Sequence, residues 1–148
     1  MRGNANRLAA TGDPFPRPRS PYISPMVSSP AYAKHPDHTI AVTPYGGRVT
    51  VRFGGVVVAE TERALVLKEA DYPAAFYIPF ADCAAGHFEK SDHATVCPFK
   101  GTATYWTLTA GGARAENAVW GYETPYDQVA SIAGHVAFYP DKVEISVG

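Results

Sequence analysis

Polar and apolar positions alternate through most of this 148-residue chain from His38 onward. Successive side chains of a β-strand point to opposite faces of its sheet, so a period of two predicts half-buried strands. Segment 102–110 is the clearest case, and its pattern requires Tyr105 and Trp106 to lie on opposite faces. Similar short runs predict further strands at 39–43, 48–53, 56–60, 64–69, 75–78, 116–122, 135–139 and 143–147, with an irregular stretch at 80–91.

Glycine pairs separate some of these runs. Gly54-Gly55 and Gly111-Gly112 each fit a two-residue hairpin turn, in which both central residues need positive φ. Residues 126–132 form the one convincing helical segment, which Gly134 would end. The sequence therefore predicts a mainly β, antiparallel domain with one short helix near 126–132.

Residues 1–36 differ in composition from the rest. They contain seven prolines and carry a local charge of +4, whereas the remainder carries −5. Proline lacks a backbone donor and interrupts both helices and sheets, so we expect a Pro-rich, basic and largely irregular tail followed by one domain at 37–148. Three interpretations of the tail stay open: an irregular leader, a basic arm that docks an acidic partner, or translation that starts at Met26.

Composition narrows the broad class. With 46% hydrophobic and 18% charged residues, the chain is typical of a soluble globular protein. The net charge of −1 and the acidic folded part favour neither nucleic acid nor an anionic membrane as a partner. No apolar run approaches the roughly 18 residues of a membrane span, and the N-terminus lacks the apolar core of a secretory signal.

Cysteine usage bears on localisation and on metals. Two cysteines without a secretory signal favour free thiols in a reducing cytoplasm, which is where we place the protein. Two cysteines also exclude a four-Cys zinc site by count. A mixed set of Cys83, Cys97, His87 and His93 matches no known ligand spacing, so we expect neither a metal nor a cofactor.

Candidate chemistry concentrates around segment 95–106. Cys97 lies four residues after His93 and three before Lys100, and nearby cations lower the pKa of a thiol and raise the fraction present as the reactive thiolate. Cys97 and His93 are therefore the candidate catalytic residues. The alternative is that Cys97 is a small buried hydrophobe.

Lys100 lies between Phe99 and Gly101, where a glycine permits close approach of a ligand to the backbone. A lysine at this position offers a point charge to a phosphate or carboxylate. Alternatively, Lys100 pairs with Asp82 or Glu116 and locks the loop. Asp82 itself is either a turn former or a residue of the same site.

Four aromatic residues lie on two strands that we expect to be neighbours across Gly111-Gly112. Trp120 and Tyr122 share a face, whereas Tyr105 and Trp106 do not. One face then belongs to the core, and the other could line an aromatic pocket for a planar or cationic ligand. The candidate ligand-binding residues are thus Lys100, Phe99, Tyr105, Trp106, Trp120, Tyr122 and Asp82.

Four segments, in the right order, resemble the motifs of one family. They read Tyr-Ile-Pro-Phe-Ala-Asp at 77–82, Thr-Val-Cys-Pro-Phe-Lys-Gly-Thr-Ala-Thr-Tyr at 95–105, Glu-Asn-Ala-Val-Trp-Gly-Tyr-Glu-Thr-Pro at 116–125 and Ile-Ala-Gly-His-Val-Ala-Phe-Tyr at 132–139. The family is catalogued as domain of unknown function 427 and is often labelled nucleotidyltransferase-like. The resemblance covers roughly His35 to Val147.

The resemblance implies an antiparallel two-sheet β-tent similar to Mss4, with a pocket between the sheets. Some tent-like folds hold zinc with four cysteines, which this chain lacks. Phe80 and Ala81 replace an Arg and a Glu of the family segment. The chain contains neither the GxxxxGK[ST] phosphate loop nor paired carboxylates of the kind that hold Mg²⁺, so the residues do not favour nucleotidyl transfer.

These observations lead to one main hypothesis and two alternatives. The main hypothesis is a small β domain that binds a small molecule or a peptide group in an aromatic pocket beside the Cys97–Lys100 loop. The first alternative is an enzyme that uses Cys97 as a nucleophile or redox thiol. The second is a structural interaction module whose basic tail docks an acidic partner.

Overall fold

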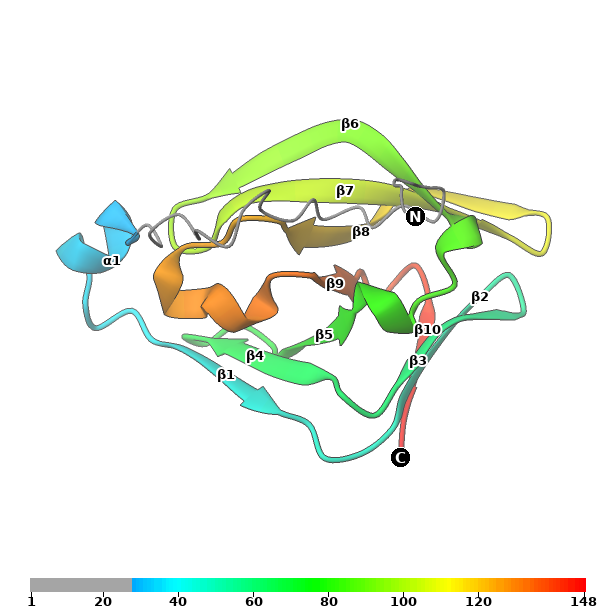
Figure 1. Cartoon of the computed structure of the whole chain (residues 1–148), viewed down its shortest axis with the longest axis horizontal. Coiled ribbons are helices and arrows are strands. Elements are labelled where there is room, and N and C mark those ends of the chain that lie inside the picture. The colour runs from blue at the N-terminus through cyan, green and yellow to red at the C-terminus, as the bar shows by residue number, and fades with distance from the viewer. Residues whose placement is uncertain (1–27) are drawn as a thin grey trace, which may run out of the picture.

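The computed structural model of the chain describes residues 28–148 (Figure 1). Residues 1–27, which make up most of the predicted tail, lie outside the described part. The elements, in chain order, are α1 (Pro30–Lys34), β1 (Ile40–Pro44), β2 (Val49–Phe53), β3 (Val56–Thr61), β4 (Leu65–Glu69), β5 (Ala75–Pro79), the 3-10 turns η1 (Phe80–Asp82) and η2 (Ala85–His87), β6 (Phe88–Cys97), β7 (Gly101–Ala110), β8 (Ala113–Tyr122), η3 (Asp127–Ile132), β9 (His135–Phe138) and β10 (Glu144–Val147).

The strands form two antiparallel sheets. The larger sheet has seven strands in the order β1-β4-β5-β9-β8-β7-β6, and the smaller sheet has three in the order β10-β2-β3. The larger sheet is bent, so that β1 and β4 lie below β7 and β6 in Figure 1, and the smaller sheet closes one end. The prediction of a mainly β, antiparallel fold is confirmed.

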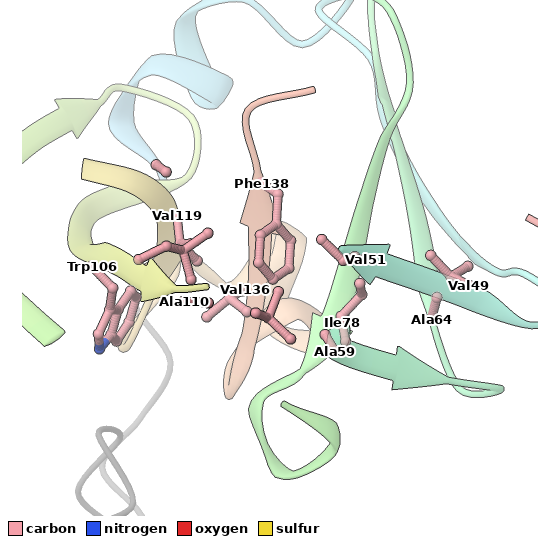
Figure 2. Close-up of a cluster of buried hydrophobic side chains, with 13 residues drawn as sticks. Val49, Val51, Ala59, Ala64, Ile78, Trp106, Ala110, Val119, Val136 and Phe138 are labelled. Atoms are coloured by element: carbon pink, nitrogen blue, oxygen red, sulfur yellow. The ribbon is translucent and has the colours of Figure 1, made fainter. Parts of the chain in front are cut away.

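The first core fills the space between the two sheets. Val49, Val51 and Val58 of the smaller sheet pack against apolar side chains of the larger one. Trp106, Val119, Val136 and Phe138 of the larger sheet belong to this core, and Figure 2 shows Val136 and Phe138 between Val119 and Val51. Trp106 is the largest of these side chains and is only 1% exposed. This core attaches the small sheet to the large one.

The second core lies on the opposite face of the larger sheet, under η3. It contains Leu67, Tyr77, Ala103, Tyr105, Tyr122 and Ala137 from the strands, and Val129 and Ile132 from η3. Adjacent side chains of a strand point to opposite faces of the sheet. Ile78 and Trp106 therefore lie in the first core, and Tyr77 and Tyr105 lie in the second. The prediction that Tyr105 and Trp106 point to opposite faces is confirmed.

Strand β6 was not predicted, since its first residues fall in the stretch expected to be irregular. It forms the edge of the larger sheet, and its side chains are mostly exposed; Val96 is 72% exposed. An edge strand with two polar faces has no apolar period, so alternation cannot reveal it. A shift in register between Lys90 and Ala94 further breaks the pattern.

The helix expected near 126–132 is a 3-10 segment, η3, rather than an α-helix. Val129 inside it has non-helical angles, with φ of −127° and ψ of 31°. The non-helical angles at Val129 interrupt the segment, which places Val129 and Ile132 over the second core.

The described end of the predicted tail is attached to the domain. Ser29 is buried, caps α1 by accepting from Tyr32 N at 3.0 Å, and donates to the Pro98 carbonyl at 2.7 Å. Its backbone N–H also donates to Gln128 Oε1 at 3.2 Å. Residues 28–34 thus contact the loop between β6 and β7 and the start of η3.

The two glycine turns contact each other. Gly54 and Gly111 have φ of 60° and 58°, as hairpin turns of this type require. An ideal Cβ placed on Gly111 would lie 1.9 Å from the Gly54 carbonyl oxygen. The hairpin of the small sheet therefore packs backbone to backbone against the hairpin of the large sheet.

This contact predicts different costs for two adjacent substitutions. Gly111→Ala should destabilise the fold by about 1–3 kcal/mol more than Gly112→Ala, because only the former collides with backbone. Gly112 has φ of 79° and open space around its Cβ position, so Gly112→Ala reports the strain of positive φ alone, about 1–2 kcal/mol. Urea unfolding measures both, and equal losses of unfolding free energy would contradict the packing of the two turns.

Candidate functional site

A pocket of about 280 Å³ opens in the curve of the larger sheet. Glu69 and Lys100 lie at its polar end, and the turn after β4 contributes Tyr72, which is 63% exposed at the rim. The full lining is Leu67, Glu69, Tyr72, Pro73, Ala75, Tyr77, Lys100, Tyr105, Trp120, Tyr122 and Tyr139. A pocket was expected between the two sheets, but the first core fills that space, and this pocket belongs to the other face.

An ion pair forms the polar end of the pocket. Lys100 Nζ lies 2.5 Å from Glu69 Oε1, and the two side chains are only 11% and 13% exposed. The other carboxylate oxygen, Oε2, lies 2.8 Å from His38 Nε2. The His38 ring stacks on Phe99 with centroids 3.9 Å apart. Glu69 thus joins the end of β4 to the turn before β7 and to the segment before β1.

The partners of Glu69 keep it ionised. Burial alone would raise the pKa of its carboxyl group, but the hydrogen bonds and charges of Lys100 and His38 outweigh burial and hold the pKa below its ordinary value. The carboxylate is therefore charged at neutral pH, and its charge is balanced inside the protein.

Tyr77 and Tyr105 of the pocket form hydrogen bonds through their hydroxyl groups. Trp120 Nε1 donates to Tyr77 Oη at 3.2 Å, and Thr95 Oγ1 lies 3.0 Å from Tyr105 Oη. Burial raises the pKa of the Tyr77 and Tyr122 hydroxyls above the ordinary value of a tyrosine. Burial, with a smaller contribution from a hydrogen bond with Tyr105, raises the pKa of Tyr139 to about 12. These hydroxyls stay protonated at neutral pH and remain available as donors.

The structure brings four of the predicted ligand-binding residues together. Lys100, Tyr105, Trp120 and Tyr122 all line the pocket. Phe99 is not part of the lining, but its ring stacks on His38, which contacts Glu69 of the pocket.

Two other predicted residues lie elsewhere. Trp106 is buried in the first core. Asp82 accepts from Thr61 at 2.5 Å and pairs with Arg63 at 2.8 Å, at the turn that follows β5. The pairing of Lys100 with Asp82 or Glu116, offered as an alternative, is wrong, because Lys100 pairs with Glu69.

The two candidate catalytic residues are not joined in the described contacts. Cys97 is half-buried against the second core. His93 is exposed on β6, and its ring centroid lies 4.6 Å from that of Tyr105. The ammonium group of Lys100 is directed to Glu69.

Sequence reasoning missed Glu69, Tyr77, Tyr139 and His38. Glu69 follows Lys68 at the end of a predicted strand, where a charged residue ordinarily faces solvent, and its partner is 31 positions away. Tyr77 could have been found from the period of two, which directs its side chain to the face opposite that of Ile78. Once the order of the strands is known, that face is the one that carries Tyr105.

The sequence of the chain also matches a known protein family. Residues 41–148 match a family described as Domain of unknown function (DUF427). The chain belongs to this family. Every pocket residue lies within the DUF427 match, whereas His38, which contacts Glu69, lies before it. A search of curated proteins found no match to the chain.

Residues 28–148 contain neither a cluster of metal ligands nor a helix that could span a membrane. No three side chains of His, Cys, Asp or Glu within that range come together as ligands for a metal ion. Cys83 and Cys97, members of the mixed set considered above, pack against different cores. Within the same range, no helix has both the length and the apolar character that crossing a bilayer requires.

The lowered pKa of Glu69 predicts how stability depends on pH. A carboxyl group whose pKa is lower in the folded state contributes stability above its unfolded pKa, and that contribution disappears as pH falls through the folded value. Glu69→Gln should therefore lose stability relative to the original chain at pH 7, and the difference should shrink below the ordinary carboxyl pKa of 4.5. Urea unfolding between pH 3 and pH 7 measures this difference.

Glu62→Gln is the matched control. Glu62 pairs with Arg48 at 2.9 Å, but both side chains are mostly exposed, and such pairs contribute only about 0–1 kcal/mol. The control should show a small difference at every pH. A Glu69→Gln difference that stays constant from pH 7 to pH 3 would contradict the role assigned to the ionised carboxylate.

Proposed function

We propose that this protein binds a small molecule or a peptide group in the pocket between Lys100 and Trp120. The observation that carries the proposal is the combination of a nearly buried ion pair and aromatic walls around one cavity. Binding pockets are concave and largely apolar, with a few placed polar groups that fix the orientation of the ligand. The pocket is small, so the bound group is small.

Two other hollows of the described structure fit this function less well. One, of about 490 Å³, lies at Arg52, Asp141, Lys142 and Glu144, and another, of about 400 Å³, lies along the exposed side of β6. Both are larger, but each is lined by several exposed, charged side chains, which water solvates well. Of these three hollows in the described part of the chain, the aromatic pocket offers a ligand the most buried apolar contact.

The enzymatic alternative has less support. A nucleophilic thiol needs a nearby cation or base, and the described contacts of Lys100 and His93 lead to Glu69 and Tyr105 instead. For the fold, we further propose an Mss4-like β-tent. The two antiparallel sheets that meet at one core support this relationship.

The two tryptophans provide a direct test. Trp120 lines the pocket and Trp106 is buried in the other core, so a ligand in the pocket should shift the indole N–H signal of Trp120 and leave that of Trp106 in place. A library of small compounds screened by two-dimensional NMR of ¹⁵N-labelled protein measures both signals at once.

Variants show whether the hits occupy this pocket. Lys100→Met should weaken each hit that shifts Trp120, whereas Lys142→Met, which removes an exposed lysine outside the pocket, should not. The proposal fails if no compound shifts the Trp120 signal, or if every hit binds Lys100→Met and the original chain equally well.

A further inference from the structure

The lining of the aromatic pocket contains hydroxyl and ammonium protons for which the described contacts give no partner. Each oxygen of Glu69 already accepts a hydrogen bond, Oε1 from Lys100 and Oε2 from His38. Tyr77 Oη accepts from Trp120, which leaves the hydroxyl proton of Tyr77 for another partner. A ligand that brings acceptor atoms could accept hydrogen bonds from these protons.

Two further donors face the same cavity. Among the described residues, no hydrogen-bond partner is found for the hydroxyl of Tyr122, although the side chain is only 5% exposed. Lys100 contributes an ammonium group with three N–H bonds, one of which is directed to Glu69. Because burial raises the pKa of Tyr77 and Tyr122, their hydroxyls keep their protons at neutral pH.

The charges of the pocket favour an uncharged ligand. Lys100 and Glu69 neutralise each other at 2.5 Å, so the lining has no net charge. A cationic ligand would find aromatic faces, which attract cations, but it would also lie beside the Lys100 ammonium. An anionic ligand would add a second negative charge beside Glu69, where little water remains to screen it.

The aromatic side chains of the lining favour a ring as the bound group. Tyr105, Trp120 and Tyr122 present rings, and a cavity of 280 Å³ lies just below the roughly 300–1,000 Å³ of pockets for drug-sized ligands. We propose that the ligand is a small, flat, uncharged ring that carries a carbonyl oxygen, which accepts hydrogen bonds from Tyr122, Tyr77 or Lys100. This inference rests on the function proposed above and specifies the chemical class of its ligand.

Three probes with the same ring and different head groups test this class. Benzamide is neutral and carries a carbonyl, benzoate is an anion, and benzylammonium is a cation. Each is titrated into the ¹⁵N-labelled full chain at pH 7, and its dissociation constant is read from the Trp120 indole signal. We expect benzamide to bind in the millimolar range, at least about tenfold more tightly than benzylammonium and more tightly than benzoate.

The outcomes separate this inference from the proposed function. If either charged probe binds most tightly, or if all three bind equally, the pocket is a binding site but the ligand class is wrong. The same conclusion follows if other compounds shift Trp120 and benzamide does not. If no compound of any class shifts Trp120, the proposed function fails, and the ligand class fails with it.

Removal of one hydroxyl tests the donor argument. Tyr122→Phe keeps the ring and should weaken benzamide about three- to tenfold, in line with the loss of one hydrogen bond. Tyr45→Phe is the control, because Tyr45 packs against the first core and its hydroxyl lies 3.4 Å from the Gly148 carbonyl. A folded Tyr122→Phe variant, verified by its NMR spectrum, that binds benzamide as well as Tyr45→Phe does would overturn the assignment of Tyr122 as a donor.

Discussion

The ion pair between Glu69 and Lys100 connects parts of the chain that are distant in sequence. Glu69 ends β4, Lys100 belongs to the turn before β7, and His38 precedes β1. Removing these charges from water costs free energy, and the pairing offsets that cost only because both carboxylate oxygens find partners. The pair therefore fixes where the turn lies relative to β4, and with it the polar end of the pocket.

The two faces of the larger sheet present different side chains, and the aromatic pocket lies on the face toward η3. Toward the small sheet, the strands present Val119, Val136 and Ile78, which pack without polar atoms. Toward η3, the same strands present Tyr77, Tyr105 and Tyr122, whose hydroxyl groups need partners. The residues given for the lining of the pocket include none from η3, which packs on the same face through Val129 and Ile132.

The sequence predicts the parts of the fold that depend on local pattern. Strands β7 and β8 follow from alternation, and the turn at Gly111 follows from its glycine pair. The edge strand β6 does not, because neither of its faces is consistently buried. Local pattern also does not reveal that η3 is a 3-10 segment, since its form depends on the core below it.

Prediction of the candidate site is limited in a similar way. The sequence points to Lys100, Tyr105, Trp120 and Tyr122, because they cluster in motif-like segments on strands expected to be neighbours. It does not identify Glu69, since the order of β4 beside β5 and β9 is a property of the whole sheet. Which carboxylate balances a buried lysine depends on that order and not on spacing in the chain.

A double-mutant cycle on Glu69 and Lys100 tests the central claim most directly. The unfolding free energies of Glu69→Gln, Lys100→Met and the double variant are compared with that of the original chain at pH 7. If the pair holds the polar end of the pocket together, the two losses should be non-additive by about 1–3 kcal/mol, because removing one charge leaves the other buried without its partner. Losses that add to within about 0.5 kcal/mol would contradict this account.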